Sequence, residues 1–145
     1  MNRIIIFLIN MILIPYLSIG QVTLIPDSNF ETALINLGYD SILDGEINTS
    51  SINNIDTLTL MYKNINDLTG IEDFTNLTVL NCDQNNLTSL NVSSNINLIR
   101  LTCTYNQLTT LTLNNNMTSL ECYFNNISNL DFSSCHYLEV VKCSY

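Results

Sequence analysis

Residues 77–92 read LTVLNCDQNNLTSLNV, and this run fits the frame L-x-x-L-x-C-x-x-N-x-L-x-x-L. The frame begins again at Leu98 and at Met117, and a partial copy begins at Leu138. A degenerate copy begins at Ile55, so successive copies start 22, 21, 19 and 21 residues apart. An internal period of about 20–50 residues is the signature of a repeat architecture, in which each unit is one supersecondary element.

The spacing within a unit predicts a short strand with one buried face. Leu80 and Cys82 are apolar and alternate with polar neighbours, which is the period of an extended chain. A single unit of this length cannot bury its apolar side, but stacked copies form a continuous core with parallel strands along one wall. The rest of each unit also alternates, so we expect extended structure and turns on the opposite, convex side, without regular helices.

An asparagine column follows the predicted strands. It consists of Asn85, Asn106 and Asn125, and it lies where the chain leaves each strand and turns. A buried asparagine amide at such a turn can bond to backbone N–H and C=O groups of its own coil and of the adjacent one. We therefore expect this column to be structural.

Four cysteines recur at the inward sixth position of the frame: Cys82, Cys103, Cys122 and Cys143. We expect a ladder of buried free thiols, because buried cysteine behaves as a small hydrophobe. Disulfides between neighbours are the alternative, since strands about 4.8 Å apart bring Cα atoms into range, although in-register side chains point the same way. A metal site is disfavoured because stacked strands place the sulfurs in a line. No metal and no other cofactor is expected.

The repeat frame resembles the leucine-rich repeat, and the resemblance covers residues 21–145. The cysteine at the sixth position and the return segment Leu87–Asn95 look like the exported, internalin-like leucine-rich-repeat proteins of Bacteroidetes. Residues Ile65–Phe74 are similar to the internalin type of unit, which has about 22 residues. The resemblance implies an α/β fold, a leucine-rich-repeat solenoid with a curved parallel β-sheet and a short N-terminal cap helix.

Residues Ile25–Tyr39 resemble the N-terminal cap of the same family. Ser28 and Glu31 fit a capping box, and Gly38 is a natural helix stop. One apolar stripe is predicted, made by Phe30, Ala33, Leu34 and Leu37. A helix of this kind would cover the open end of the solenoid.

The N-terminus is typical of an export signal. Arg3 precedes the apolar run Ile4–Ile14, Pro15 breaks it, and the small residues Ser18 and Gly20 suit cleavage after Gly20. The run is shorter than the roughly 20 residues of a membrane span, and an uncleaved anchor helix is the alternative. The predicted organisation is a signal peptide at 1–20, a helical cap and lead-in at 21–54, and repeats at 55–145, with no membrane span in the mature chain.

Composition excludes several classes of function. The net charge is −9 and the chain has only four Lys and Arg, which argues against nucleic acid as a partner because phosphate binding needs clustered cations. The single histidine, His136, makes histidine-based metal sites and serine-histidine-aspartate chemistry improbable. Cys135 beside His136 is the one candidate nucleophile pair, but adjacency in sequence is no guide to geometry. We therefore expect no enzymatic activity.

The candidate ligand surface is the outward face of the strands together with one rim. The position before the asparagine column holds Tyr62, Gln84, Tyr105, Phe124 and Tyr145. Aromatic residues are favoured interface anchors because they bury a large area at low entropy cost. Packing against the turn below is the alternative role. The predicted ligand-binding set is Tyr62, Arg100, Thr102, Tyr105, Glu121, Tyr123, Phe124 and Tyr145.

These observations predict an exported or cell-surface recognition module that binds a protein or glycan ligand through its concave strand face. Two other functions stay open. One is a structural role, as a spacer or as the N-terminal fragment of a larger surface protein. The other is an enzyme that uses the Cys135–His136 pair.

Overall fold

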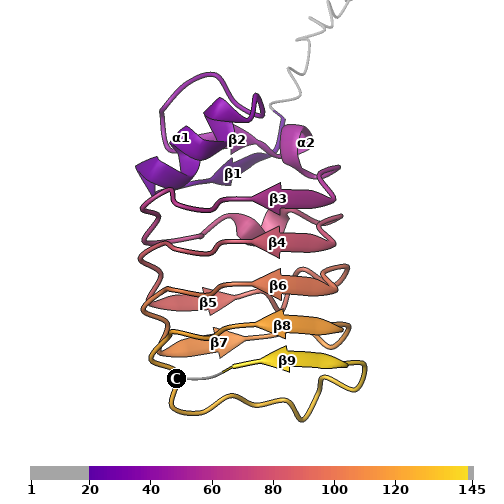
Figure 1. Cartoon of the computed structure of the whole chain (residues 1–145). Coiled ribbons are helices and arrows are strands. Elements are labelled where there is room, and N and C mark those ends of the chain that lie inside the picture. The colour runs from indigo at the N-terminus through magenta and orange to yellow at the C-terminus, as the bar shows by residue number, and fades with distance from the viewer. Residues whose placement is uncertain (1–19, 144–145) are drawn as a thin grey trace, which may run out of the picture.

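The computed structural model describes residues 20–143, so residues 1–19 of the predicted signal peptide and Tyr145 lie outside the described residues. The chain forms a stack of coils in which short parallel strands lie one below another (Figure 1). We call this sheet the strand wall, and its strands in spatial order are β3 (Thr57–Thr59), β4 (Val79–Asn81), β6 (Arg100–Thr102), β8 (Ser119–Glu121) and β9 (Val140–Lys142). The predicted solenoid with a parallel sheet is confirmed.

The register of the strand wall is the one that the repeat frame predicts. Leu80 of β4 is aligned with Leu58 of β3 on one side and with Leu101 of β6 on the other. Leu101 is aligned in turn with Leu120 of β8. These four leucines are buried, and the residues on either side of each in its strand point away from the core. The degenerate unit that begins at Ile55 therefore stacks like the others.

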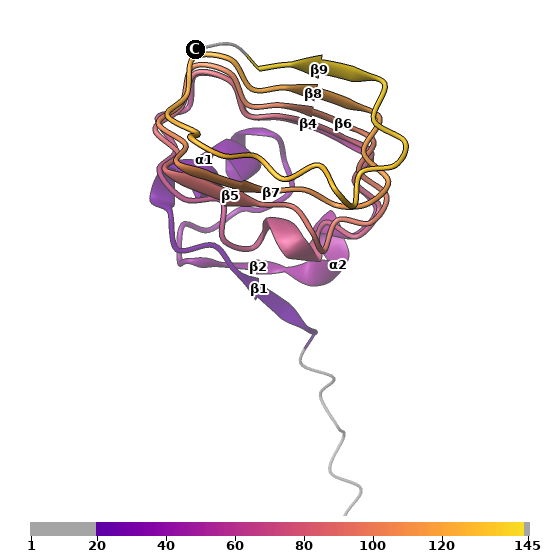
Figure 2. The ribbon, with the colours of Figure 1, turned by 90° about the horizontal axis from the view of Figure 1, so that it is seen from below.

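The opposite wall carries a second, shorter parallel pair. Strand β5 (Ser89–Asn91) pairs in register with β7 (Thr110–Thr112), and Figure 2 shows them across the core from the strand wall. The first unit has one 3₁₀ turn there, η1 (Ile71–Asp73). The described part of this wall thus consists of extended segments and turns, as expected from the alternation of Leu90 and Val92 with polar residues.

The N-terminal end of the stack has a different construction. Strand β1 (Val22–Leu24) pairs antiparallel with β2 (Glu46–Asn48), and they lie next to the helices α1 (Ser28–Asn36) and α2 (Thr49–Ile52). In Figure 1 these elements lie at the end of the stack beyond β3. Phe30 of α1 stacks on Phe74 of the first repeat, with ring centroids 6.2 Å apart, so one continuous core joins the two parts.

The capping box predicted at the start of α1 is wrong. Asp27 is the N-cap, and its Oδ1 accepts hydrogen bonds from the N–H groups of Asn29 and Phe30 at 2.9 and 3.0 Å. The Glu31 carboxylate is buried and turned elsewhere, where its Oε1 accepts from the N–H groups of Asp44 and Gly45. The carboxylate thus holds the loop before β2 instead of the helix start.

The C-terminal end of α1 agrees with the prediction in one respect and differs in another. Gly38 adopts a φ of 82°, and the following Tyr39 N–H bonds to the Leu34 carbonyl at 3.0 Å, which is the glycine stop expected there. Leu37, expected in the buried stripe, is largely exposed because it is the C-cap residue and lies beyond the last buried turn.

The last described coil lies at the other end of the stack. Strand β9 is exposed along its whole length, and Phe132 and Val141 are partly exposed although their counterparts in earlier units are buried. No described coil packs over them, which accounts for the difference. Within residues 20–143, no helix is long and apolar enough to cross a membrane.

Candidate binding surface

The asparagine column forms the hydrogen-bonded ladder that the sequence predicts. Asn85 Nδ2 donates to the carbonyls of Leu60 and Cys82 at 2.8 and 3.0 Å, and its Oδ1 accepts from the N–H groups of Lys63 and Ile65 at 3.1 Å each. The amide therefore satisfies backbone groups of its own coil and of the preceding one. Asn106 and Asn125 repeat this arrangement in the next two coils.

The residue just before the asparagine column has an unusual backbone, and this holds also in the first unit, where Lys63 stands in place of the asparagine. Asn106 Nδ2 donates to the carbonyls of Cys103 and Thr104, three and two residues earlier, so the chain curls back between Thr104 and Asn106. The residue in between, Tyr105, has a φ of 52°. The equivalent residues Tyr62, Gln84 and Phe124 have φ values of 56°, 55° and 56°. This left-handed region is rare for bulky side chains.

The same position displays aromatic rings to solvent. Tyr62, Tyr105 and Phe124 are 63%, 48% and 49% exposed. We define the aromatic rim as these three residues together with Tyr123, which is half-buried. The Tyr105 and Phe124 rings stack at a centroid distance of 4.4 Å, and Tyr123 lies edge-on to both at 6.0 and 5.4 Å. Three of the four rings thus form one cluster.

Tyr62 lies apart from that cluster, at the N-terminal end of the rim. Its hydroxyl accepts a hydrogen bond from the Gln84 side-chain amide. Gln84 therefore continues the row between Tyr62 and the three clustered rings, as a polar member. Gln84 was absent from the predicted ligand-binding set, although the sequence shows that it occupies the same repeat position as the aromatic residues.

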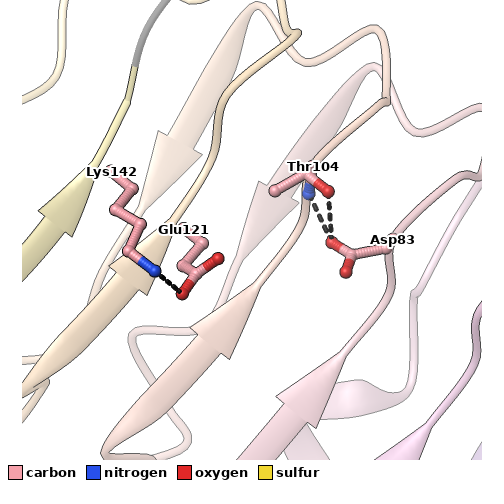
Figure 3. A network of polar contacts seen from close by, with 4 residues as sticks. All are labelled: Asp83, Thr104, Glu121 and Lys142. Carbon is pink, nitrogen blue, oxygen red and sulfur yellow. Dashed lines mark hydrogen bonds and ion pairs between the residues drawn. The ribbon is translucent and has the colours of Figure 1, made fainter.

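Beside the rim, the outward face of the strand wall is polar and sparsely charged. Lys142 Nζ forms an ion pair with Glu121 Oε1 at 2.7 Å, and this hydrogen bond raises the pKa of Lys142. Asp83 Oδ1 accepts from both the N–H and the hydroxyl of Thr104, at 2.6 and 2.9 Å (Figure 3). Both carboxylates are therefore engaged within the protein.

Arg100 and Thr102, two further members of the predicted set, lie on β6 in the middle of the strand wall. Arg100 is exposed, and its side chain makes no hydrogen bond or ion pair to any residue that the structure describes. The predicted set thus divides into an aromatic cluster, a separate Tyr62, and two outward residues of β6, whereas Glu121 is held by Lys142. Lys142, which lies beside Glu121 because β8 is aligned with β9, was absent from the predicted ligand-binding set.

The cysteine column departs from the prediction. Cys122 and Cys143 form a disulfide with Cα atoms 4.9 Å apart, whereas Cys82 and Cys103 are buried thiols. The expected ladder of four free thiols is therefore wrong at its last step. In-register side chains do leave the strands in the same direction, but at this Cα separation two sulfurs can turn toward each other within the range that a disulfide spans.

A second ladder on the return side was missed. Three residues before the start of a unit, Asn95 Nδ2 donates to the Ile71 carbonyl at 2.7 Å, and Asn114 Nδ2 donates to the Leu98 carbonyl at 2.8 Å. Cys135 holds the same position in the next coil, where it is buried and its thiol contacts the Asn114 carbonyl. The sequence did contain a signal for this ladder, because its three members each lie three residues before the first residue of a unit, namely Leu98, Met117 and Leu138.

This placement gives Cys135 a structural role in the ladder. Its sulfur lies inside the stack, whereas the side chain of His136 is exposed. Over residues 20–143, no group of three or more His, Cys, Asp or Glu side chains is arranged to hold a metal ion.

The repeat frame, the stacked parallel strands and the asparagine ladder together define a leucine-rich-repeat solenoid. No model of a known protein family matches the chain, and no curated protein matches it either. Solved structures do match in fold. The functional domain of InlJ from Listeria monocytogenes, described as including a cysteine ladder, is 24% identical with a TM-score of 0.53, covering 86% of this chain and 43% of that one.

Two further structures come from Listeria monocytogenes as well. The internalin InlF is 20% identical with a TM-score of 0.61, covering 83% of this chain and 44% of that chain. Internalin C2 is 19% identical with a TM-score of 0.61, covering 88% and 70% respectively. The chain thus spans less than half the length of the first two structures. At these identities the similarity is one of fold, and the fold is internalin-like.

Proposed function

We propose that this protein is an exported recognition module that binds a protein ligand through the strand wall, with the aromatic rim as its anchor. The proposal rests on one observation above the others. Tyr62, Tyr105 and Phe124 combine a left-handed backbone with an exposed aromatic side chain at the same repeat position.

This combination is costly for the fold. A non-glycine residue in a sparsely populated backbone region costs about 1–3 kcal/mol, and glycine or asparagine takes the left-handed conformation more readily than a bulky residue. Asparagine is abundant in this chain, and Asn64 adopts a φ of 57° in the same turn as Tyr62. Asparagine would adopt this backbone conformation at a lower cost than tyrosine or phenylalanine. The presence of aromatic residues in the rim therefore favours a role in binding over a role in stabilising the fold.

The ring geometry favours a protein over a glycan. Sugar rings stack on open aromatic faces, but Tyr105 and Phe124 turn one face each toward the other. The two facing ring surfaces are therefore closed to a sugar, whereas the ring edges and the two tyrosine hydroxyls suit the apolar and hydrogen-bonding groups of a protein surface. Internalin-like folds among the structural neighbours support an interaction module as the class.

Two further parts of the proposal concern the N-terminal residues. We propose that residues 1–20 direct export, on the apolar run and the cleavage pattern of the sequence. We also propose that α1, β1 and β2 act as the N-terminal cap of the solenoid. The stacking of Phe30 on Phe74 supports this role, since it covers the apolar side of the first repeat.

The test is a binding screen with matched variants of the chain that begins at Gln21. The wild type and the double variant Tyr105→Asn, Phe124→Asn are immobilised and exposed to purified extracellular proteins and to a glycan array. Thr112→Ala on β7, an exposed residue of the opposite wall, is the control. We expect a protein ligand whose affinity falls at least tenfold in the double variant and is unchanged in the control.

Two results would contradict the proposal. One is a ligand that binds the wild type and the double variant equally. The other is a screen in which only glycans bind. Circular dichroism of all three proteins is needed to show that the double variant keeps its strand content.

A further inference from the structure

The three steps of the cysteine column share one backbone geometry. The N–H of Cys82 donates to the Thr102 carbonyl, that of Cys103 to the Glu121 carbonyl, and that of Cys122 to the Lys142 carbonyl, each at 2.9 Å. In every step the acceptor is the residue that directly precedes the next cysteine. The step from Cys82 to Cys103 therefore has the same backbone relation as the step from Cys122 to Cys143, which is a disulfide.

The sulfur of Cys82 already points along that step. Its thiol contacts the Thr102 carbonyl at 3.5 Å, next to Cys103, and the Cys103 thiol contacts the Glu121 carbonyl at 3.7 Å in the same way. Both side chains are fully buried among leucines. The two thiols thus lie on adjacent coils, in the core, with no residue between them in the column.

Only one disulfide pattern joins all four cysteines of the column through bonds between neighbouring coils. Four cysteines on successive coils can form two bonds between neighbours only as Cys82–Cys103 and Cys122–Cys143. A bond between Cys103 and Cys122 would leave Cys82 and Cys143 at opposite ends, three coils apart. Because the last step is bonded in the structure, the remaining pair is fixed as Cys82 with Cys103.

We propose that Cys82 and Cys103 are a second disulfide site, oxidised when the chain folds in a compartment that supplies disulfide oxidants. In the reaction, the two thiols exchange with a disulfide RSSR, which gives the Cys82–Cys103 bond and two molecules of RSH. Two electrons and two protons pass from the cysteines to RSSR, which is thereby reduced to two molecules of RSH. The oxidant is a low-molecular-weight disulfide or a thiol–disulfide oxidoreductase.

Because the two thiols are buried in the folded protein, we expect the disulfide to form during folding, before the coils close over them. Burial raises the pKa of the Cys82 thiol and that of Cys103, and the neighbouring Asp83 carboxylate adds to the effect at both. Since the thiolate is the attacking species, the folded pair reacts slowly. The carbonyls of both cysteines also accept from Nδ2 of Asn106, the residue that follows Tyr105 of the aromatic rim.

The test is a disulfide map of the chain from Gln21, reduced in denaturant and refolded in a mixture of reduced and oxidised glutathione. Free thiols are then blocked with iodoacetamide. Cleavage after Arg, Lys and Glu places Cys82 in the peptide 73–100, Cys103 in 101–121, and Cys122 with Cys135 in 122–139. We expect 73–100 linked to 101–121, and 122–139 linked to the C-terminal peptide 143–145, with Cys135 alkylated.

Two variants give matched controls. Cys103→Ser should leave Cys82 alkylated and keep the second link, and Cys135→Ser should leave both links intact. The wild-type map decides the matter even if a variant fails to fold. Refolded monomer with both Cys82 and Cys103 alkylated would overturn the proposal, and so would a link between 101–121 and 122–139.

Discussion

The ring of Tyr105 stacks on the ring of Phe124 one coil further along the solenoid, with 21° between their planes. Each residue directly precedes an asparagine of the buried ladder and has a positive φ. Each of the three ring pairs in this cluster contributes about 0.5–1.5 kcal/mol, and each of the two left-handed backbones costs about 1–3 kcal/mol. Ring contacts therefore offset the backbone cost without a clear surplus, so they do not by themselves account for aromatic residues here, and we assign Tyr105 and Phe124 to binding.

The register of the strand wall is tested by Leu101→Asp. Leu101 is fully buried on β6 between Leu80 and Leu120, so an aspartate there places an unpaired charge where the coils stack. We expect no cooperative folding by circular dichroism and thermal melting. Thr102→Asp, on the outward side of the same strand, should fold. A soluble Leu101→Asp variant that melts like the wild type would show that the register is wrong.

The asparagine ladder is tested by Asn106→Ala. This change leaves the Leu87 N–H and the carbonyls of Cys82 and Cys103 without their side-chain partner inside the core. Each buried group that loses its partner costs about 1–3 kcal/mol, so urea unfolding should show a loss of at least that size. Gln107→Ala, at an exposed neighbouring position, serves as the control. Equal urea midpoints for the two variants would show that the hydrogen bonds of Asn106 do not stabilise the fold.

The contact between the N-terminal elements and the first repeat is tested by a pair of glycine substitutions. Gly70 and Gly38 both have positive φ, at 101° and 82°. A Cβ at Gly70 would lie 2.5 Å from the Leu24 carbonyl oxygen, whereas a Cβ at Gly38 would meet nothing within 4 Å.

We therefore expect Gly38→Ala to cost about 1–2 kcal/mol through its backbone alone, and Gly70→Ala to cost clearly more. Both costs are read from urea unfolding. If the two variants lose the same free energy of unfolding, β1 does not press against Gly70 as described.

The Asp27 carboxylate predicts a pH dependence of stability. Burial opposes its ionisation, but hydrogen bonds from the N–H groups of Asn66, Phe30, Asn29 and Asp67 outweigh this and lower its pKa below 3.8. A lowered folded pKa stabilises the protein above the unfolded value, and this stability is lost as the pH falls through the folded pKa.

Asp27→Asn keeps a residue that can cap the helix but removes the charge. We expect the gap in urea midpoint between wild type and variant to be constant above about pH 5 and to close below 3.8. A gap that does not change between these values would mean that the carboxylate charge contributes nothing there.

Much of the fold was accessible from the sequence because the repeat reports its own register. Leu58, Leu80, Leu101 and Leu120 align because each occupies the same place in its unit, and the asparagine ladder follows from the same spacing. The start of α1 was not accessible in this way. Asp27 and Ser28 are both good caps, and Asp27 is the one used because its second oxygen also holds the N–H of Asn66, 39 residues away.

The candidate surface was accessible only in part. The position of the aromatic residues could be read from the repeat, but their positive φ could not, because it depends on how the backbone turns after each strand. The Cys122–Cys143 disulfide was missed for a similar reason. Spacing fixes which cysteines are neighbours, whereas the direction of each sulfur depends on side-chain rotation.

The most direct test of the central claim is the free energy of unfolding of Tyr105→Asn, measured in urea beside Leu108→Ala. Leu108 is fully buried, so its truncation should cost about 2–5 kcal/mol. Tyr105→Asn relieves backbone strain but loses the ring contacts to Tyr123 and Phe124. These effects oppose each other, so we expect a stability within about 1 kcal/mol of the wild type. A loss as large as that of Leu108→Ala would contradict the account, because the aromatic rim would then be packing rather than a binding surface.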